Sequence, residues 1–376
     1  MRKTFKYRIS AKKETTAKAE YWLELCRVLY NSALAERIYA YKMQGMTISC
    51  FSQINQLPDI KQENPEYRLV GSQALQEVLE RLDKAYKAFF RRVEQGGVPG
   101  FPRFRGKYRY DSFTLKQAGW KLEGKYLYVR NVGRFKLKLS RQIEGDIKTI
   151  TIGRSPTNKW YACFSCDNVP ERRLPQSDRT IGLDVGIKSF LTDSEGTKVE
   201  NPKFLKRTLK ELRVRQRKLA KARRGSSRRK KTKLRVAKCH EKIANQRRDF
   251  HHKLADKYVK GYGIIVIENL GIANMVQNHK LARDISDCAW GEFFEILSYR
   301  AEEAGREVIK APRFEPTSKR CSYCGEVNHK LKLSDRTWAC LQCGTIHDRD
   351  ENAAINLKRF GQNHQEVTYA STQCVS

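Results

Sequence analysis

The chain has 376 residues and is strongly basic, with 75 Lys and Arg against 41 Asp and Glu and a formal net charge of +34. Such an imbalance favours a polyanionic partner, and nucleic acid is the leading candidate. No stretch approaches the roughly 18 uncharged apolar residues of a membrane-spanning helix, so none is expected. Because one hydrophobic core rarely serves so long a chain, we expect two or three domains.

The cysteines and the first residues bear on the cellular compartment. The sequence holds 11 cysteines without the regular spacing of a disulfide framework, and residues 1–6 lack the apolar core of a signal peptide. Both features are typical of proteins in a reducing environment. We therefore expect a cytoplasmic protein.

The N-terminal part combines β and helical patterns. Residues 4–10 alternate as a strand does, but the strand needs partners from elsewhere in the chain. Apolar positions at helical spacing predict helices over 15–43 and 72–93. Short alternating runs, separated by Gly, Asn and Asp turns, predict a small β-barrel or sandwich; they lie at 112–115, 126–130, 135–139, 148–152 and 159–164.

Residues 96–107 interrupt the helical pattern with Gly and Pro and interleave aromatic side chains with arginines. Aromatic faces can stack on bases while guanidinium groups hold phosphates, which suits single strands or RNA. Alternatively, the two phenylalanines are core residues beneath a turn. The candidate nucleic-acid contacts here are Phe101, Arg103, Phe104 and Arg105.

A second basic segment covers residues 203–260, where a leucine stripe predicts two long helices broken at 225–227. The segment could be a solvated surface, but so one-sided a charge repels itself unless phosphates are present. We therefore interpret it as a helical hairpin that contacts nucleic acid. The candidate contacts at its turn are Arg223, Arg224, Arg228, Arg229 and Lys230.

Two buried apolar strands each carry one carboxylate, Asp184 within 180–191 and Glu268 within 263–270. A single strand-end aspartate is commonly a turn or cap residue, but an unpaired charge inside an apolar run is costly to bury. A third acidic cluster follows at 348–351. Within it, Asp348 is either a support for Asp350 or a cap on the following helix.

Two CxxC pairs stand 15 residues apart, which is the spacing of a structural zinc site. Four cysteines already fill a tetrahedral site, so we do not expect His347 to be a zinc ligand. The four expected ligands are Cys321, Cys324, Cys340 and Cys343.

The order of these elements matches a ribonuclease-H-like α/β fold, in which two neighbouring strands and a later helix each supply a carboxylate. Asp184, Glu268 and Asp350 are then expected to converge. Three such carboxylates can hold two Mg²⁺ ions about 3.5–4 Å apart for hydrolysis of a phosphodiester. Magnesium prefers oxygen ligands, which explains a site without histidine or cysteine.

Several motifs together resemble the TnpB family of transposon-encoded RNA-guided nucleases, which is related to type V CRISPR effectors. They are GLDVG at 182–186, VIENL at 266–270, the paired CxxC and DRDENAA at 348–354. The resemblance covers nearly the whole chain, and the family pattern Asp-x-Asn favours Asp350 as the third carboxylate.

The resemblance implies a set of domains. A wedge β-barrel would comprise 1–10 and 97–172, with a helical recognition domain inserted at 11–96. A RuvC-like nuclease domain would comprise 178–316 and 347–361, with a zinc ribbon at 317–346. Residues 362–376 are expected to form a disordered tail.

The resemblance also implies an activity and partners. A guide RNA from the transposon end would pair with one strand of double-stranded DNA, a short motif beside the target would be recognised, and the RuvC site would cut both strands. Gln76 lies where the family places a motif-facing helix. We expect a monomer, in a prokaryotic cytoplasm and at the nucleoid when bound to DNA. The alternatives are a guided repressor that does not cut and a DNA transposase.

Overall fold

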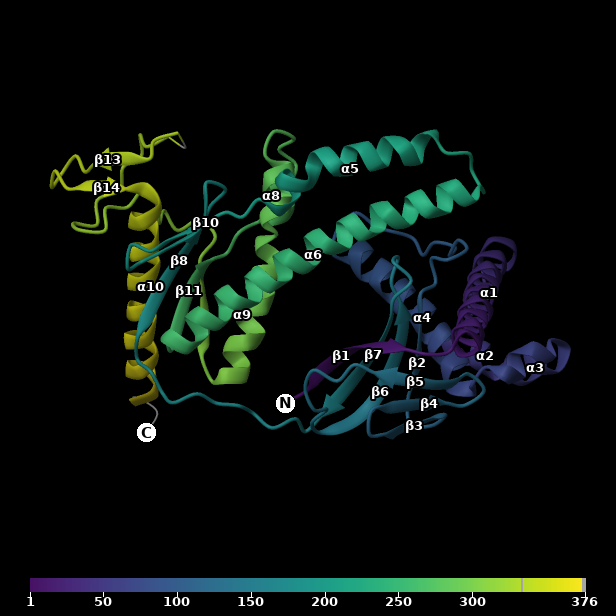
Figure 1. Cartoon of the computed structure of the whole chain (residues 1–376). Helices are drawn as coiled ribbons and strands as arrows, with labels where there is room; N and C mark the ends of the chain where they lie inside the picture. The colour runs from purple at the N-terminus through teal and green to yellow at the C-terminus, as the bar shows by residue number, and fades with distance from the viewer. Residues whose placement is uncertain (333, 374–376) are drawn as a thin grey trace. The chain divides into compact units, whose positions relative to one another are not determined.

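The computed structural model describes residues 1–332 and 334–373, with side chains up to residue 363 (Figure 1). The chain divides into two compact units, Met1–Pro170 and Glu171–Ser376, and each has its own hydrophobic core. None of the described helices has the length and apolar content that crossing a bilayer requires.

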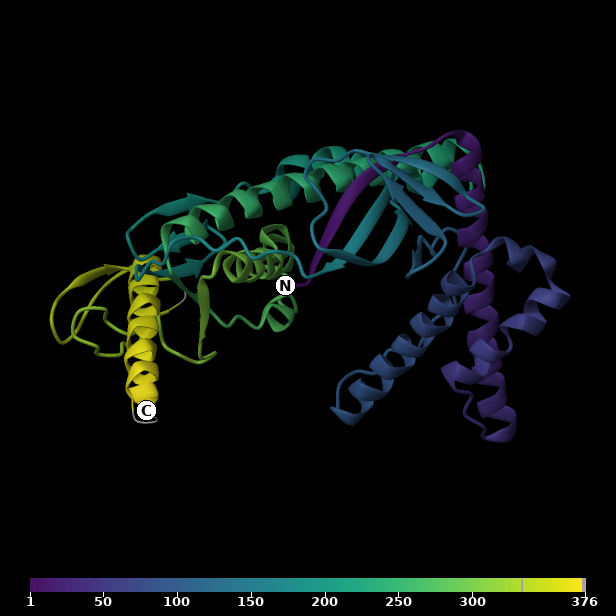
Figure 2. The same ribbon diagram turned by 90° about the horizontal axis from the view of Figure 1, so that it is seen from below.

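Unit 1 is built on a seven-stranded antiparallel sheet in the order β2-β6-β7-β1-β5-β4-β3. Strand β1, Lys3–Ser10, lies between β7 and β5, so the predicted first strand does find distant partners. The sheet is curled (Figure 2), and among the described residues no ladder joins its edge strands β2 and β3, so the predicted barrel or sandwich is an open, curled sheet. The other strands are β2 Ser112–Leu115, β3 Trp120–Glu123, β4 Tyr126–Val129, β5 Gly133–Leu137, β6 Asp146–Arg154 and β7 Trp160–Asp167.

The helices of unit 1 pack around two long members, α1 and α4. Helix α1, Lys13–Gln44, ends at Gly45, whose left-handed backbone is one that glycine adopts without strain. Helix α4, Ser72–Glu94, buries Leu75 and Leu79 in the same core as Leu29 of α1. The shorter helices between them were not predicted, because no long apolar period marks them; they are α2 Cys50–Asn55, α3 Leu57–Glu63 and the 3-10 helix η1 Pro65–Leu69.

Unit 2 contains a five-stranded sheet in the order β10-β9-β8-β11-β12. Strands β8, β11 and β12 are parallel neighbours, whereas β8, β9 and β10 form antiparallel hairpins. This mixed arrangement follows from the chain order, since two hairpins precede the helical segments that cross over to β11 and β12. The strands are β8 Thr180–Val185, β9 Ser189–Asp193, β10 Lys198–Glu200, β11 Ile264–Glu268 and β12 Glu307–Ala311.

Helices cover both faces of this sheet (Figure 1). Ile265 and Ile267 of β11 pack with helices α6, Ser227–Gly261, and α9, Trp290–Ala304. Ile264 and Val266, on the alternate positions, pack instead with Leu357 of α10, Arg349–Gln373. The sheet is therefore the central layer of a three-layer unit.

The basic segment folds as two helices, α5 Phe204–Lys221 and α6, which confirms the predicted break near Gly225. The left-handed backbone of Ala289, with a φ of 51°, separates α8, Ala282–Cys288, from α9. The remaining elements of unit 2 are α7 Ile272–Met275 and the two-stranded ladder of β13 Thr337–Ala339 and β14 Ile346–Asp348.

The C-terminal stretch 362–376 was expected to be a disordered tail. The backbone of residues 362–373 instead continues α10, the helix that packs on β11 through Leu357. Residues 374–376 lie outside the described residues.

Helix α10 approaches the sheet most closely at Gly182 of β8. A Cβ added to Gly182 would lie 2.0 Å from the carbonyl oxygen of Ala354 and 2.6 Å from the amide nitrogen of Lys358. Both atoms belong to the helix backbone, which cannot rotate away as a side chain can. Glycine is thus the residue that lets α10 rest directly on the strand.

We predict that Gly182→Ala lowers the free energy of unfolding by about 1–3 kcal/mol, the usual cost of overpacking a core. Urea denaturation of the purified protein measures this change. Gly261→Ala is the matched control, because a Cβ at Gly261 meets no atom within 4 Å. Equal stability of the two variants would contradict the close contact between α10 and β8.

Candidate active site

Two of the predicted carboxylates lie at the ends of neighbouring parallel strands. The register of β8 and β11 pairs Leu183 with Ile267, so Asp184 and Glu268 occupy the next position on each strand. Leu183 and Ile267 belong to the core on the α6 and α9 face. Because side chains alternate between the faces of a strand, Asp184 and Glu268 point to the α10 face.

Asp350 comes to the same face from the first turn of α10. It lies one helical turn before Ala354, whose carbonyl oxygen is at the contact with Gly182. Asp184 is two residues beyond Gly182 on β8. The topology therefore brings together the three carboxylates that the sequence singled out.

The electrostatics of the site follow from this convergence. Burial and the nearby carboxylates of Glu268 and Asp350 raise the pKa of Asp184 well above its ordinary value. Burial also raises the pKa of Glu268, although the hydroxyl of Thr317 and the charge of Arg349 act in the opposite direction. The site is therefore short of positive charge, which is the condition that favours binding of cations.

Asp348 has a different role from Asp350. Its Oδ1 accepts hydrogen bonds from the backbone amides of Asp350 and Glu351 at 3.1 Å each, which caps the start of α10. Burial opposes its ionisation, but these bonds and one from Lys198 Nζ at 2.6 Å outweigh burial and lower the pKa of Asp348. The structure thus confirms the cap interpretation of this residue.

Two arginines of the cysteine-rich segment and of α10 lie beside the acidic residues. Arg336 Nη1 donates to Asp350 Oδ1 at 3.3 Å. Arg349 is linked to the same loop, because its backbone amide donates to the carbonyl of Arg336 at 2.8 Å. Both guanidinium groups act to lower the pKa of Asp184, so they offset part of the negative charge.

Sequence reasoning missed Thr317, whose hydroxyl donates to Glu268 Oε1 at 2.8 Å. Its side chain is buried, and it lies in the segment between β12 and the first cysteine pair. The local sequence holds no signal for this role, since the contact spans 49 residues. The position could have been found only by recognising that the segment after β12 passes the end of β11.

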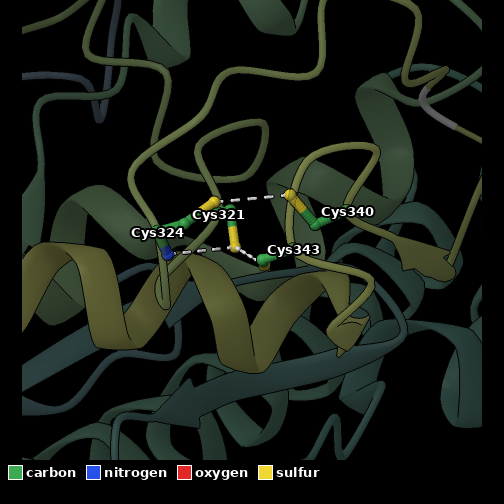
Figure 3. Close-up of side chains that lie close together, drawn as sticks. All are labelled: Cys321, Cys324, Cys340 and Cys343. Carbon is green, nitrogen blue, oxygen red and sulfur yellow. Dashed lines mark hydrogen bonds between the residues drawn. The ribbon is translucent and has the colours of Figure 1, made fainter.

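The four predicted cysteines converge from two loops (Figure 3). Their sulfur atoms all lie within 4.8 Å of one another, with 3.7 Å between Cys321 and Cys343 and 3.5 Å between Cys324 and Cys340. Four sulfur donors at this separation fit one tetrahedral zinc ion. The Thr345 hydroxyl and amide lower the pKa of Cys343 to about 6, which favours the thiolate that metal binding needs.

Within the part of the chain that the structure describes, this is the one group of three or more His, Cys, Asp and Glu side chains with ligand atoms so close together.

His347 lies beside the cysteines but outside their group. Its Nε2 is 3.0 Å from Cys321 Sγ, and its ring lies against Trp338 at a tilt of 40°, with 4.8 Å between the centroids. The imidazole is buried, and burial lowers its pKa. His347 thus contacts one of the sulfur atoms while the four cysteines make up the group, as the sequence indicated.

The predicted aromatic and arginine loop belongs to unit 1. Asn31 of α1 holds the backbone of Arg105 through two hydrogen bonds, accepting from its amide at 2.7 Å and donating to its carbonyl at 2.9 Å. Phe101 packs edge-on against Phe89 at 5.3 Å yet is 47% exposed, and Phe104 is 57% exposed. Both rings are therefore partly exposed. They are neither core residues buried beneath a turn nor fully exposed surfaces for stacking on bases. Arg103 is exposed.

The remaining candidate nucleic-acid contacts differ in how exposed their side chains are and in whether these are hydrogen-bonded within the protein. Gln76 is half-buried on α4. Arg229 is engaged within its own hairpin, because its Nη1 donates to the carbonyls of Leu219 and Ala222 at 2.8 and 2.9 Å at the end of α5. The other basic residues at this turn are exposed; they are Arg223, Arg224, Arg228 and Lys230.

Three family models match parts of the chain. The model described as "Probable transposase" (OrfB_IS605) matches residues 163–279, and the model described as "Cas12f1-like, TNB domain" matches 290–357. A third, described as a helix-turn-helix domain, matches 1–46. In the structure this last region is one strand followed by the single long helix α1, so it does not form a helix-turn-helix.

Relatives match over almost the full length. A "Putative RNA-guided DNA endonuclease" of Streptomyces pristinaespiralis is 32% identical over 96% of this chain and 90% of its own. A "Putative RNA-guided DNA endonuclease InsQ" of Escherichia coli (strain K12) is 30% identical over 89% of this chain and 86% of its own. Cas12f1, in a complex with sgRNA and target DNA, shares the fold with a TM-score of 0.59 at 17% identity, over 92% of this chain and 83% of that one. The chain therefore belongs to the TnpB (IS605 OrfB) family, and its fold is similar to that of Cas12f1.

Proposed function

We propose that this protein is an RNA-guided DNA endonuclease that hydrolyses phosphodiester bonds at Asp184, Glu268 and Asp350. The observation that carries the proposal is the placement of these carboxylates on one face of a sheet, from β8, β11 and the first turn of α10. The full-length relatives described as RNA-guided DNA endonucleases support the same activity. The acidic site supplies the chemistry, and a guide RNA supplies the choice of target.

The sheet order of unit 2 supports a ribonuclease-H-like fold of the RuvC type, formed by 178–316 and 347–361 around a zinc ribbon at 317–346. Three strands joined by two hairpins, β8, β9 and β10, are followed by the parallel strands β11 and β12, and the five form its sheet. In unit 1 the curled sheet corresponds to the wedge domain, 1–10 and 97–172, and the helices at 11–96 to the recognition domain. The protein acts in the cytoplasm and, when bound to DNA, at the nucleoid.

Divalent magnesium fits the acidic site, because its donors are carboxylate oxygens and burial leaves their charges uncompensated. Asp184, Glu268 and Asp350 would hold the ions. A pair of Mg²⁺ ions, when bound, supplies an activated water and stabilises the leaving oxygen of the phosphodiester.

The chain's own residues prepare the site for this chemistry. The parallel register of β8 and β11 holds Asp184 beside Glu268, and the cap made by Asp348 fixes the first turn of α10 and with it Asp350. Arg336 and Arg349 offset part of the negative charge of the carboxylates. These residues orient the carboxylates before the substrate arrives, so less reorganisation is needed during the reaction.

Guide RNA and double-stranded DNA are the partners that the basic charge of the chain supports. In unit 1 the exposed side chains of Arg103 and Phe104 could hold a phosphate and stack on a base, and Gln76 on α4 would contact the motif beside the target. In unit 2 the exposed arginines at the α5–α6 turn would contact the nucleic-acid backbone, whereas Arg229 serves mainly to close the turn.

Two other functions use the same fold. A guided repressor would bind RNA and DNA without cutting, but it would not require the three acidic residues that this chain keeps together. The description of one matching family model, "Probable transposase", favours a transposase. A transposase would join DNA ends without a guide RNA. Cleavage that depends on RNA would therefore distinguish the proposed nuclease from a transposase.

Asp184→Ala is predicted to abolish cleavage, with a loss larger than the about 10–100-fold typical of an outer-shell partner of a metal. Protein purified with RNA co-expressed from its flanking DNA is incubated with Mg²⁺ and a plasmid library randomised beside the target, and the cut ends are sequenced. Asp178→Ala, an exposed residue just before β8, is the control and should cut as the wild type does.

The same assay separates the competing functions. No cleavage by the wild-type complex, or undiminished cleavage by Asp184→Ala, would overturn the nuclease assignment. Binding to the target without cleavage would identify the repressor. Products that are joined rather than cut, formed without RNA, would identify a transposase.

We further propose that the cysteine group binds one structural Zn²⁺ ion. Four sulfur donors fit zinc rather than magnesium, and the group lies apart from the carboxylates, so it shapes the chain and takes no part in the reaction.

The double variant Cys321→Ser/Cys340→Ser is predicted to lose one zinc ion per chain and to melt at a lower temperature, because binding of a structural metal contributes to folding. Zinc content is measured by mass spectrometry and melting by circular dichroism. Cys163→Ser, from the separate CxxC on β7, is the control and should keep its zinc. Full zinc occupancy in the double variant would remove the assignment.

A further inference from the structure

The segment between β12 and the first cysteine pair provides a hydroxyl to the acidic site. Thr317 Oγ1 lies 2.8 Å from Glu268 Oε1, and the threonine is only 5% exposed. An ionised carboxylate can only accept hydrogen bonds, so the hydroxyl is the donor. This bond occupies Oε1 and fixes the rotation of the carboxylate about its last torsion, which is otherwise broad.

Two buried asparagines of α10 hold this segment in place. Asn356 Nδ2 donates to the carbonyl of Thr317 at 2.8 Å and to that of Arg320 at 2.6 Å. Asn352 Nδ2 donates to the carbonyl of Arg320 at 2.8 Å. We call this pair the asparagine clamp; Asn352 is 1% and Asn356 8% exposed, so water cannot easily replace their bonds.

The asparagine clamp also joins the cysteine group to the carboxylates. Asn352 Oδ1 accepts from the backbone amide of Ser322 at 2.9 Å, next to the ligand Cys321. Asp350 lies in the first turn of the same helix. One helix therefore fixes a cysteine loop, the threonine that contacts Glu268, and the third carboxylate.

We propose that Thr317 is a positioning residue that orients Glu268 for divalent metal binding, and that the asparagine clamp holds Thr317 in register with Asp350. The inference rests on the proposed function, because it takes the three carboxylates as ligands of Mg²⁺. Outer-shell partners that orient a ligand change metal affinity by about 10–100-fold when they are removed. Thr317 acts through Glu268 and contacts no reacting group itself.

The test measures metal binding in the absence of nucleic acid. Full-length, zinc-loaded protein is titrated with Mn²⁺ as the probe, and free Mn²⁺ is followed by electron paramagnetic resonance. Thr317→Val replaces the hydroxyl with a methyl group of similar size and should weaken the Asp184-dependent sites by about 10-fold or more. Thr317→Ser keeps the hydroxyl and should bind within about twofold of the wild type if hydrogen bonding, rather than packing, is what matters.

Matched variants separate positioning from a general loss of structure. Thr180→Val makes the same exchange at a buried threonine at the other end of β8 and should bind Mn²⁺ as the wild type does. Melting curves show whether each variant is folded. If Thr317→Val is unfolded, Thr317→Ala is used in its place. The Mg²⁺ concentration for half-maximal cleavage should rise in the same order as the Mn²⁺ dissociation constant.

The outcomes distinguish this inference from the function on which it rests. If wild-type protein binds Mn²⁺ no better than Asp184→Ala, both the acidic metal site and the role of Thr317 are overturned. If Asp184→Ala loses binding but folded variants without the hydroxyl bind as the wild type does, only the role of Thr317 is overturned. Equal weakening in Thr317→Ser and Thr317→Val would likewise contradict positioning by the hydroxyl.

Discussion

Charge repulsion at the end of the β8 and β11 pair is the constraint on which the rest of unit 2 depends. Asp184, Glu268 and Asp350 are brought together by strand register and by the close approach of α10. Burying a carboxylate is unfavourable, and placing like charges beside it adds to the cost; both effects raise the pKa of Asp184. The carboxylates stay together because the sheet and the packed helix α10 hold them in place and the guanidinium groups of Arg336 and Arg349 offset part of their charge.

Much of this site could be predicted because it follows from local patterns and chain order. An apolar strand interrupted by one carboxylate marks Asp184 and Glu268, and two-residue alternation then determines which face each one joins. The CxxC spacing marks the cysteine group in the same direct way. Each of these signals lies within a few residues of the side chain concerned.

The parts that escaped prediction depend on contacts between distant residues or on weak local patterns. Thr317 meets Glu268 across 49 residues, and the role of Asn352 appears only once α10 is packed against the segment that it holds. Strand β3 is short and follows a glycine turn, so its alternation is too brief to recognise. The break at Ala289 needs a left-handed backbone, which the residue type itself does not favour.

The acidic site repels the phosphates of a nucleic acid, whereas the basic chain as a whole attracts them. A net charge of +34 attracts phosphates over long distances, whereas three carboxylates would repel the phosphate that the proposed reaction brings to them. Arg336 and Arg349 reduce this repulsion but do not remove it, since three negative charges face two positive ones. Divalent cations bound by the carboxylates would reverse the local sign. In the proposed reaction, metal ions would therefore be required by the charges of the chain itself as well as by the chemistry of phosphodiester hydrolysis.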